Sequence, residues 1–212
     1  EWNTDFELIL PNDLRSGLYA IRLTTATGGE DHVPFFVRPQ PGASSAEIVF
    51  LAPTATYTAY ANSRLHFQAP GIEIMQGRLS LVTSNAMFLL EHPECGLSLY
   101  DHHADGSGVC VSSRLRPILD MRPKTRLWSL NSDTHILSWL ESSGFDYDVL
   151  TDEDLDREGE AALRPYRVVL TGSHPEYVSK GMLDSLHTHL HRGGRLMYLG
   201  GNGFYWNTVY HP

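Results

Sequence analysis

The stretch that decides the predicted fold is Arg167–Tyr177, which reads Arg-Val-Val-Leu-Thr-Gly-Ser-His-Pro-Glu-Tyr. Residues 168–170 form a short apolar run rich in β-branched side chains, which is typical of a buried strand. The Thr-Gly-Ser that follows ends the strand, and Ser179 is a suitable N-cap for a helix over residues 179–192. The stretch therefore predicts a strand, a turn and a helix, which together form a unit of an α/β protein.

Two titratable side chains, His174 and Glu176, lie in the predicted turn. In an open α/β sheet this turn belongs to the carboxyl edge of the strands, where ligands bind. Pro175 restrains His174 to an extended geometry, and the start of the following helix favours an anionic Glu176. From spacing alone, the two residues are either part of a binding site or a capping carboxylate beside a surface histidine.

Strands and helices alternate around this stretch. Alternation at these lengths predicts right-handed βαβ units and a mostly parallel sheet with flanking helices, as in flavodoxin-like or glutamine-amidotransferase-like folds. We expect residues 168–170 in the interior of that sheet and a helix that begins at Ser132 or Asp133. The predicted strands cover residues 48–51, 97–100, 127–130, 147–150, 168–170 and 195–199.

Residues 1–39 show the alternation of β-strands instead. The candidate strands are Phe6–Leu10, Gly17–Thr25 and Val33–Arg38, and a glycine-rich turn separates the last two. About forty residues cannot bury a core of their own. We therefore interpret this region as a β hairpin that ends a β-sandwich-like module and packs on or beside the α/β unit.

The composition shifts after this hairpin. Residues 40–46 are expected to be a linker, because they are rich in proline, glycine and serine. Residues 47–212 are expected to form an α/β catalytic domain, truncated at its C-terminus in a chain cut from a longer protein.

The composition limits the classes of function. With 16 basic and 25 acidic residues the net charge is −9, which argues against a nucleic-acid partner. Nothing approaches a run of about 18 apolar residues, so we expect no membrane segment. The two cysteines, Cys95 and Cys110, match no disulfide or zinc pattern and are expected to be free thiols in a reducing, cytoplasmic setting.

Common nucleotide and nucleophile motifs are missing from the sequence. No G-x-G-x-x-G opens a helix after the first α/β strand, and no G-x-x-x-x-G-K-[ST] occurs. The Gly172-Ser173-His174 segment resembles part of a nucleophile elbow, but the full G-x-S-x-G is absent.

A metal site remains as the best interpretation of the polar loops at the carboxyl edge. One ligand set, His102 and His103 with His174 and Glu176, would suit zinc or ferrous iron. The other uses tyrosine phenolates, which need a strong Lewis acid such as ferric iron because the free pKa is about 10. A single tyrosine is more simply an amphipathic wall residue. The candidates are Tyr57, Tyr60, Tyr100, Asp101, His102, His103, Asp105, His174, Glu176 and Asn202.

Several motifs resemble those of one known family, the large (beta) subunit of N,N-dimethylformamidase in its C-terminal catalytic region. The most specific are His-Pro-Glu-Tyr and Gly-Gly-Asn-Gly-Phe-Tyr-Trp, and the similarity spans nearly the whole chain. The matching segments are 35–39, 53–62, 99–101, 105–108, 114–123, 172–177 and 199–206.

The resemblance implies hydrolysis of N,N-dimethylformamide to dimethylamine and formate at a mononuclear iron (Fe3+) held by two tyrosines and a glutamate. Carried over by motif, the ligands are Tyr60, Tyr100 and Glu176, with Tyr57 as the alternative to Tyr60. His174 is the neighbouring histidine and acts with Glu176 in catalysis. A truncated chain can lack this iron.

The chemistry of the reaction requires a pocket around the site. Tyr57, Asn202, Phe204 and Tyr205 are expected to wall a small pocket for a small amide substrate. A small subunit and a homo-oligomer are the expected partners. Two other classes stay open: a non-catalytic α/β binding or scaffold domain, and a related hydrolase that acts on another amide or on an ester.

Overall fold

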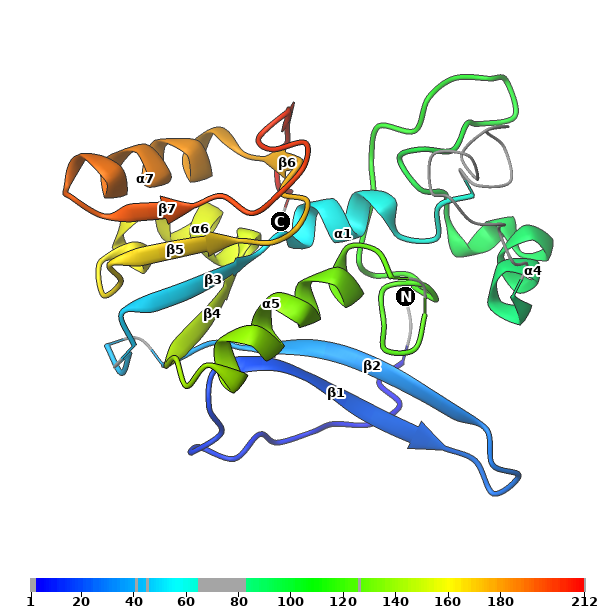
Figure 1. Cartoon of the computed structure of the whole chain (residues 1–212). Helices are drawn as coiled ribbons and strands as arrows, with labels where there is room; N and C mark the ends of the chain where they lie inside the picture. The colour runs from blue at the N-terminus through cyan, green and yellow to red at the C-terminus, as the bar shows by residue number, and fades with distance from the viewer. Residues whose placement is uncertain (1–2, 41, 45, 65–82, 126, 212) are drawn as a thin grey trace.

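The computed structural model describes residues 3–40, 42–44, 46–64, 83–125 and 127–211 (Figure 1). Its centre is a parallel sheet of four strands in the order β4-β3-β5-β7. These strands are β3 (Ile48–Ala52), β4 (Tyr147–Thr151), β5 (Val168–Thr171) and β7 (Arg195–Met197). Strand β5 pairs with β3 on one side and β7 on the other, so the predicted interior position of residues 168–170 is confirmed.

Alternate side chains of β3 face two different layers. Val49 and Leu51 pack against α6 (Asp152–Glu158), the short helix η2 (Gly159–Leu163) and α7 (Lys180–His191). Phe50 and Ala52 face α5 (Leu130–Ser142) and the N-terminal hairpin. Figure 1 shows α7 on one side of the sheet and α5 with the hairpin on the other. The apolar runs of the strands follow from this burial on both faces, and the predicted α/β class is confirmed.

The N-terminal hairpin consists of β1 (Gly17–Thr24) and β2 (Glu30–Val37), which pair antiparallel. Leu18 and Phe36 pack against the layer of α5 and β4. Arg38 ties the end of the hairpin to α6, where its guanidinium lies 2.8 Å from Asp154. The hairpin therefore packs on the α/β unit, as predicted.

Three strand predictions are wrong. Phe6–Leu10 is not a strand: Ile9 is 92% exposed, and no described strand pairs with the segment. Residues 97–100 form a turn, because the Asp101 carboxylate accepts a hydrogen bond from the Ser98 amide at 2.9 Å. Residues 127–130 lead into α5, which begins at Leu130 with Ser129 as its N-cap, in place of the predicted Ser132 or Asp133.

The short strand at 127–130 fails because its apolar residues serve a helix. Leu130, Leu137 and Leu140 are buried at helical spacing, whereas Leu127 is exposed. Strand β7 is also shorter than the predicted 195–199, and it ends at Met197.

The carboxyl ends of the strands lead into the segments that build the site. Helix α1 (Thr54–Tyr60) follows β3 directly, and β6 (Tyr177–Val178) follows the turn after β5. Strand β6 pairs with β8 (Trp206–Asn207), which joins the loop after β7 to the same edge. The remaining elements are α4 (Ser84–Glu91) and η1 (Pro93–Cys95). None of the described helices is long and apolar enough to cross a membrane.

Candidate active site

Three chain segments meet at the carboxyl edge of the sheet. Helix α1 brings Tyr60, the turn at residues 97–101 brings Tyr100, and the turn after β5 brings His174 and Glu176. We call these four residues the Glu176 cluster. Because parallel strands present their following loops at one edge, residues far apart in the sequence can meet here.

The polar atoms of the Glu176 cluster converge on one atom, the Oε2 oxygen of Glu176. The Tyr60 hydroxyl donates to it at 2.7 Å and the Tyr100 hydroxyl at 3.1 Å. The Nε2 atom of His174 lies 2.9 Å from the same oxygen. Glu176 is only 4% exposed, so its carboxylate depends on these partners in place of water.

The backbone around Glu176 is fixed from two sides. Its amide donates to the Thr56 hydroxyl of α1 at 3.0 Å. Its carbonyl accepts from the amides of Tyr205 and Trp206, both at 2.9 Å. Gly200 lets the loop after β7 approach this turn, because a Cβ at Gly200 would overlap the ring of Pro175. The carboxylate is therefore held by rigid elements on both sides.

Tyr60 and Tyr100 are held against each other. Their rings stack with centroids 4.1 Å apart. The turn that carries Tyr100 is docked on the end of α1, because the Ser98 hydroxyl donates to the Ala59 carbonyl at 2.8 Å. The Arg116 guanidinium bridges the same segments by donating to the carbonyls of Ala61 and Gly96. The two hydroxyls thus reach Glu176 from a preformed support.

Burial controls the protonation of the two phenols. Burial raises the pKa of Tyr60 above its ordinary value, and the adjacent Glu176 carboxylate raises it further against the opposing effect of Tyr100. Burial is also the main cause that raises the pKa of Tyr100. Both side chains therefore stay protonated near neutral pH unless a cation replaces the protons.

Tyr57, the alternative to Tyr60 and a predicted pocket residue, has a different partner. Its hydroxyl donates to Asp133 Oδ2, and Asp133 Oδ1 accepts from the Ser173 amide at 2.6 Å. We call Tyr57, Asp133 and Ser173 the Asp133 cluster. Gly172 makes room for it, since a Cβ there would overlap the Asp133 carboxylate. Tyr57 thus supports the turn that carries His174 without donating to Glu176.

The last loop approaches the cluster through its backbone, whereas the Phe204 ring packs against the layer of α6, η2 and α7 and the Tyr205 ring packs against Trp206. Asn202 is exposed. Phe204 is half-buried, and its amide donates to the Pro175 carbonyl at 2.8 Å. Tyr205 is 69% exposed. A Cβ at Gly201 would lie 3.4 Å from His174 Nδ1, so it is the glycine backbone of this loop that approaches the imidazole.

The alternative ligand set based on His102 and His103 is not assembled. Both residues are exposed, and His102 forms a bridge with Gly108 inside its own loop. Over the described part of the chain, no three His, Cys, Asp or Glu side chains are close enough together to hold a metal ion.

Two aromatic residues beside the cluster are not among the site residues predicted from the sequence. The Trp128 ring lies 5.2 Å from the His174 ring and 5.7 Å from the Tyr60 ring, measured between centroids, and Trp128 is 36% exposed. The Tyr177 hydroxyl donates to the Tyr100 hydroxyl at 3.1 Å. Trp128 lies in a segment that the sequence predicts as a strand, and Tyr177 enters the prediction only as the last residue of the His-Pro-Glu-Tyr motif.

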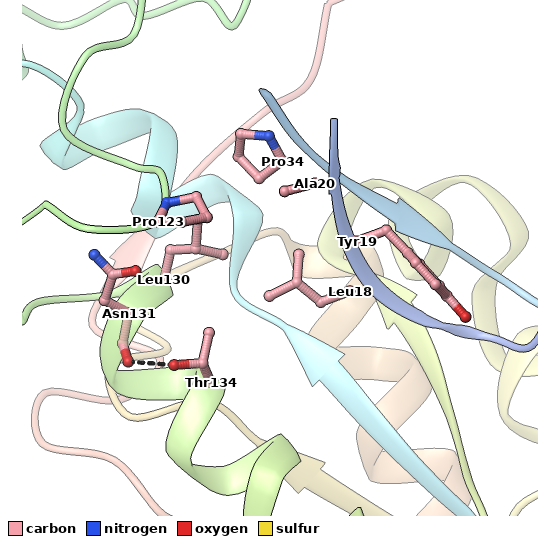
Figure 2. Close-up of a pocket in the computed structure, with 8 residues that line it drawn as sticks. All are labelled: Leu18, Tyr19, Ala20, Pro34, Pro123, Leu130, Asn131 and Thr134. Carbon is pink, nitrogen blue, oxygen red and sulfur yellow. Dashed lines mark hydrogen bonds between the residues drawn. The ribbon is translucent and has the colours of Figure 1, made fainter. Parts of the chain in front are cut away.

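A separate cavity of about 170 Å³ lies between the hairpin and α5 (Figure 2). Leu18, Pro34 and Leu130 are among the residues that line it. It contains none of the predicted catalytic, metal-binding or pocket residues, so it is not the candidate active site.

Comparisons with known proteins agree with the motif resemblance. Residues 1–212 match the family described as N,N-dimethylformamidase beta subunit-like, C-terminal. A relative named N,N-dimethylformamidase beta subunit from Paracoccus aminophilus is 43% identical over 217 residues, and one of the same name from an Alcaligenes species is 42% identical. Each alignment covers the whole of this chain but only 28% of the relative, so the chain spans just over a quarter of their length.

Proposed function

Because this chain belongs to the N,N-dimethylformamidase beta subunit-like, C-terminal family, we propose that it carries the metal-binding catalytic site of an amide hydrolase. The proposed reaction is hydrolysis of N,N-dimethylformamide, or a close analogue, to an amine and formate. The observation that carries the proposal is the convergence of two phenols and an imidazole on one oxygen of the buried Glu176.

The donor set supports a ferric ion. Tyr60, Tyr100 and Glu176 offer three hard oxygen donors that become anionic together when the phenols lose their protons, and three negative charges balance one Fe3+. Buried charges are tolerated when they are paired or bind a metal. A phenol whose pKa is raised by burial needs a cation of this strength to ionise at neutral pH.

Hydrolysis also needs a polarised carbonyl, a proton for the departing amine and a surface that binds the substrate. Bound ferric iron would supply the Lewis acidity that polarises an amide carbonyl and makes a water more acidic. His174 is assigned the role of holding a proton and passing it to the departing amine, and its Nε2 atom 2.9 Å from Glu176 Oε2 supports this role. Trp128 offers a partly exposed apolar face for the methyl groups of the substrate.

The assembly of the protein is also a proposal. The relatives are named as beta subunits, and this supports a further, smaller subunit as a partner of the whole protein. Co-purification of tagged full-length protein from its own host tests this, and a single polypeptide with full activity would contradict it.

Metal analysis and activity together test the proposed function. In the full-length protein, Glu176→Ala should lose both iron and hydrolysis of N,N-dimethylformamide, whereas His174→Ala should lose rate and keep most iron. Tyr147→Phe is a matched control, because its hydroxyl binds Glu141 at 2.9 Å, outside the cluster. Full activity in Glu176→Ala, or iron-free wild-type protein with full activity, would contradict the proposal.

A further inference from the structure

We infer that Tyr177 is a positioning residue that tunes the metal-binding oxygen of Tyr100 through a hydrogen bond. The inference rests on the proposed function, since it assigns Tyr100 as a ligand. It adds to the Glu176 cluster an outer partner that contacts neither the metal nor the substrate directly. Such outer partners commonly set the orientation and donor strength of a metal ligand.

The direction of the hydrogen bonds supports this role. The Tyr177 hydroxyl donates to the Tyr100 oxygen at 3.1 Å, and the Tyr100 hydroxyl donates onward to Glu176 Oε2 at 3.1 Å. When Tyr100 gives up its proton to bind a cation, its oxygen becomes anionic and needs a donor. Tyr177 already occupies that position, and a hydrogen bond to an ionised acceptor is stronger than one between neutral groups.

Tyr177 is fixed by the same supports as the ligands. Its amide donates to the Thr56 hydroxyl at 3.2 Å, the same hydroxyl that accepts from the Glu176 amide at 3.0 Å. In β6 it pairs with Trp206 of β8. The Tyr177 ring packs on the apolar cluster that includes Tyr60 and Met121. The hydroxyl is therefore held in register with Glu176 and does not sample the surface freely.

The ring alone does not account for a tyrosine at this position. A phenylalanine would fill the same space against Tyr60 and Met121. The hydroxyl adds one specific contact, and among the described residues its hydrogen-bond partner is Tyr100. The contact is thus the feature that a substitution to phenylalanine removes.

The hydrogen bond has a predictable spectroscopic effect. In a ferric phenolate, visible light moves electron density from the phenolate oxygen to the metal. A donor on that oxygen stabilises its electrons and raises the energy of the transition. Removing the Tyr177 hydroxyl should therefore shift the visible absorption maximum to longer wavelength, while the three proposed ligands and the bound iron stay in place.

The test compares Tyr177→Phe with Tyr147→Phe in iron-loaded full-length protein, by visible absorption and iron content. Tyr147 is a suitable control, since it is buried and its hydroxyl binds Glu141 outside the cluster. We expect full iron in both variants and a shift to longer wavelength in Tyr177→Phe alone.

The other outcomes distinguish a failure of this inference from a failure of the proposed function. An unchanged absorption maximum in Tyr177→Phe at full iron content would overturn the inference and leave the proposed function intact. Loss of iron in Tyr177→Phe would also overturn it, because Tyr177 would then be needed for binding itself. A wild-type protein that holds iron without a visible phenolate band would overturn both this inference and the assignment of the tyrosine ligands.

Discussion

Helix α1 carries Tyr57 and Tyr60 about one turn apart, and each belongs to a tyrosine–carboxylate pair. The two pairs have the same chemistry but differ in how their hydrogen bonds are shared. In the Asp133 cluster each carboxylate oxygen has its own donor: the Tyr57 hydroxyl on Oδ2 and the Ser173 amide on Oδ1. In the Glu176 cluster two phenols and an imidazole crowd on the single oxygen Oε2. In the first arrangement every carboxylate oxygen has a hydrogen-bond donor. In the second, a cation could replace the phenol protons that crowd on Oε2.

The surroundings of the two clusters differ in the same direction. Asp133 is 1% exposed, and the buried Tyr57 ring stacks on the hairpin side chain Phe36. Glu176 is nearly as buried, but its partner His174 lies against Trp128, which is 36% exposed. A fully buried tyrosine–carboxylate pair suits a structural role. A pair beside partly exposed side chains suits a site that a small molecule must enter. The comparison separates a structural carboxylate from a proposed catalytic one.

The largest effect should come from replacing each carboxylate with its isosteric amide. Glu176→Gln should abolish hydrolysis and iron binding, with little change in the urea midpoint when both proteins are compared without iron. Asp133→Asn should keep iron and most activity but lose about 1–3 kcal/mol of unfolding free energy, because a buried acceptor is lost. Equal loss of activity and stability in the two variants would break the comparison.

Removal of the Tyr57 hydroxyl should destabilise the fold without touching the proposed chemistry. The hydroxyl donates to a buried carboxylate, and such a bond contributes about 1.5–3 kcal/mol. Urea unfolding of Tyr57→Phe measures this loss, and its Michaelis constant for the amide should stay unchanged. A stable Tyr57→Phe variant with impaired turnover would place Tyr57 in the site.

Trp128 tests the open side of the Glu176 cluster. Trp128→Ala removes the apolar face beside His174, so the preference for N,N-dimethylformamide over unsubstituted formamide should fall roughly tenfold. The ratio of kcat/KM values for the two amides measures this preference. An unchanged ratio would exclude Trp128 as a wall for the methyl groups.

A smaller effect concerns pH. Burial raises the pKa of Asp133, against the lowering effects of the hydrogen bonds from Ser173 and Tyr57. The folded state therefore holds the Asp133 proton more tightly than the unfolded state, where the pKa is about 3.9. The contribution of Asp133 to stability is greatest below the unfolded pKa and falls as the pH rises through the folded one.

Urea unfolding over a pH series, compared between wild type and Asp133→Asn, isolates this contribution. The stability advantage of the wild type should be larger at acid pH than at neutral pH. An advantage that grows with pH would mean that the folded state favours the charged carboxylate.

Local sequence patterns predicted the sheet but not every segment that leads into it. Apart from Asp148, residues 48–51, 147–150 and 168–170 are apolar or aromatic, a pattern that predicts burial on both faces of a parallel sheet. Leu127–Leu130 carries the same apolar signal, but tertiary packing uses Leu130 to start a helix. Phe6–Leu10 has the alternation of a strand and no described partner to pair with.

The candidate site likewise combines residues that local sequence patterns predict and residues that only tertiary contacts bring together. The turn after β5 was readable from the sequence, because a strand, a break and a helix cap fix where His174 and Glu176 lie. Tyr57 and Tyr60 could not be separated, since they lie three residues apart on one helix and only its orientation decides which carboxylate each meets. Trp128 and Tyr177 join the site through contacts between segments, which no local pattern reveals.

The most direct test of the central claim is visible absorption, with iron content, of the full-length wild type and of three phenylalanine variants. The wild type should show a phenolate-to-ferric charge-transfer band. Tyr60→Phe and Tyr100→Phe should each lose band intensity and iron, whereas Tyr57→Phe should keep both, because its hydroxyl serves Asp133. A band that depends on Tyr57, or that survives the loss of both other hydroxyls, would contradict the assignment of the Glu176 cluster.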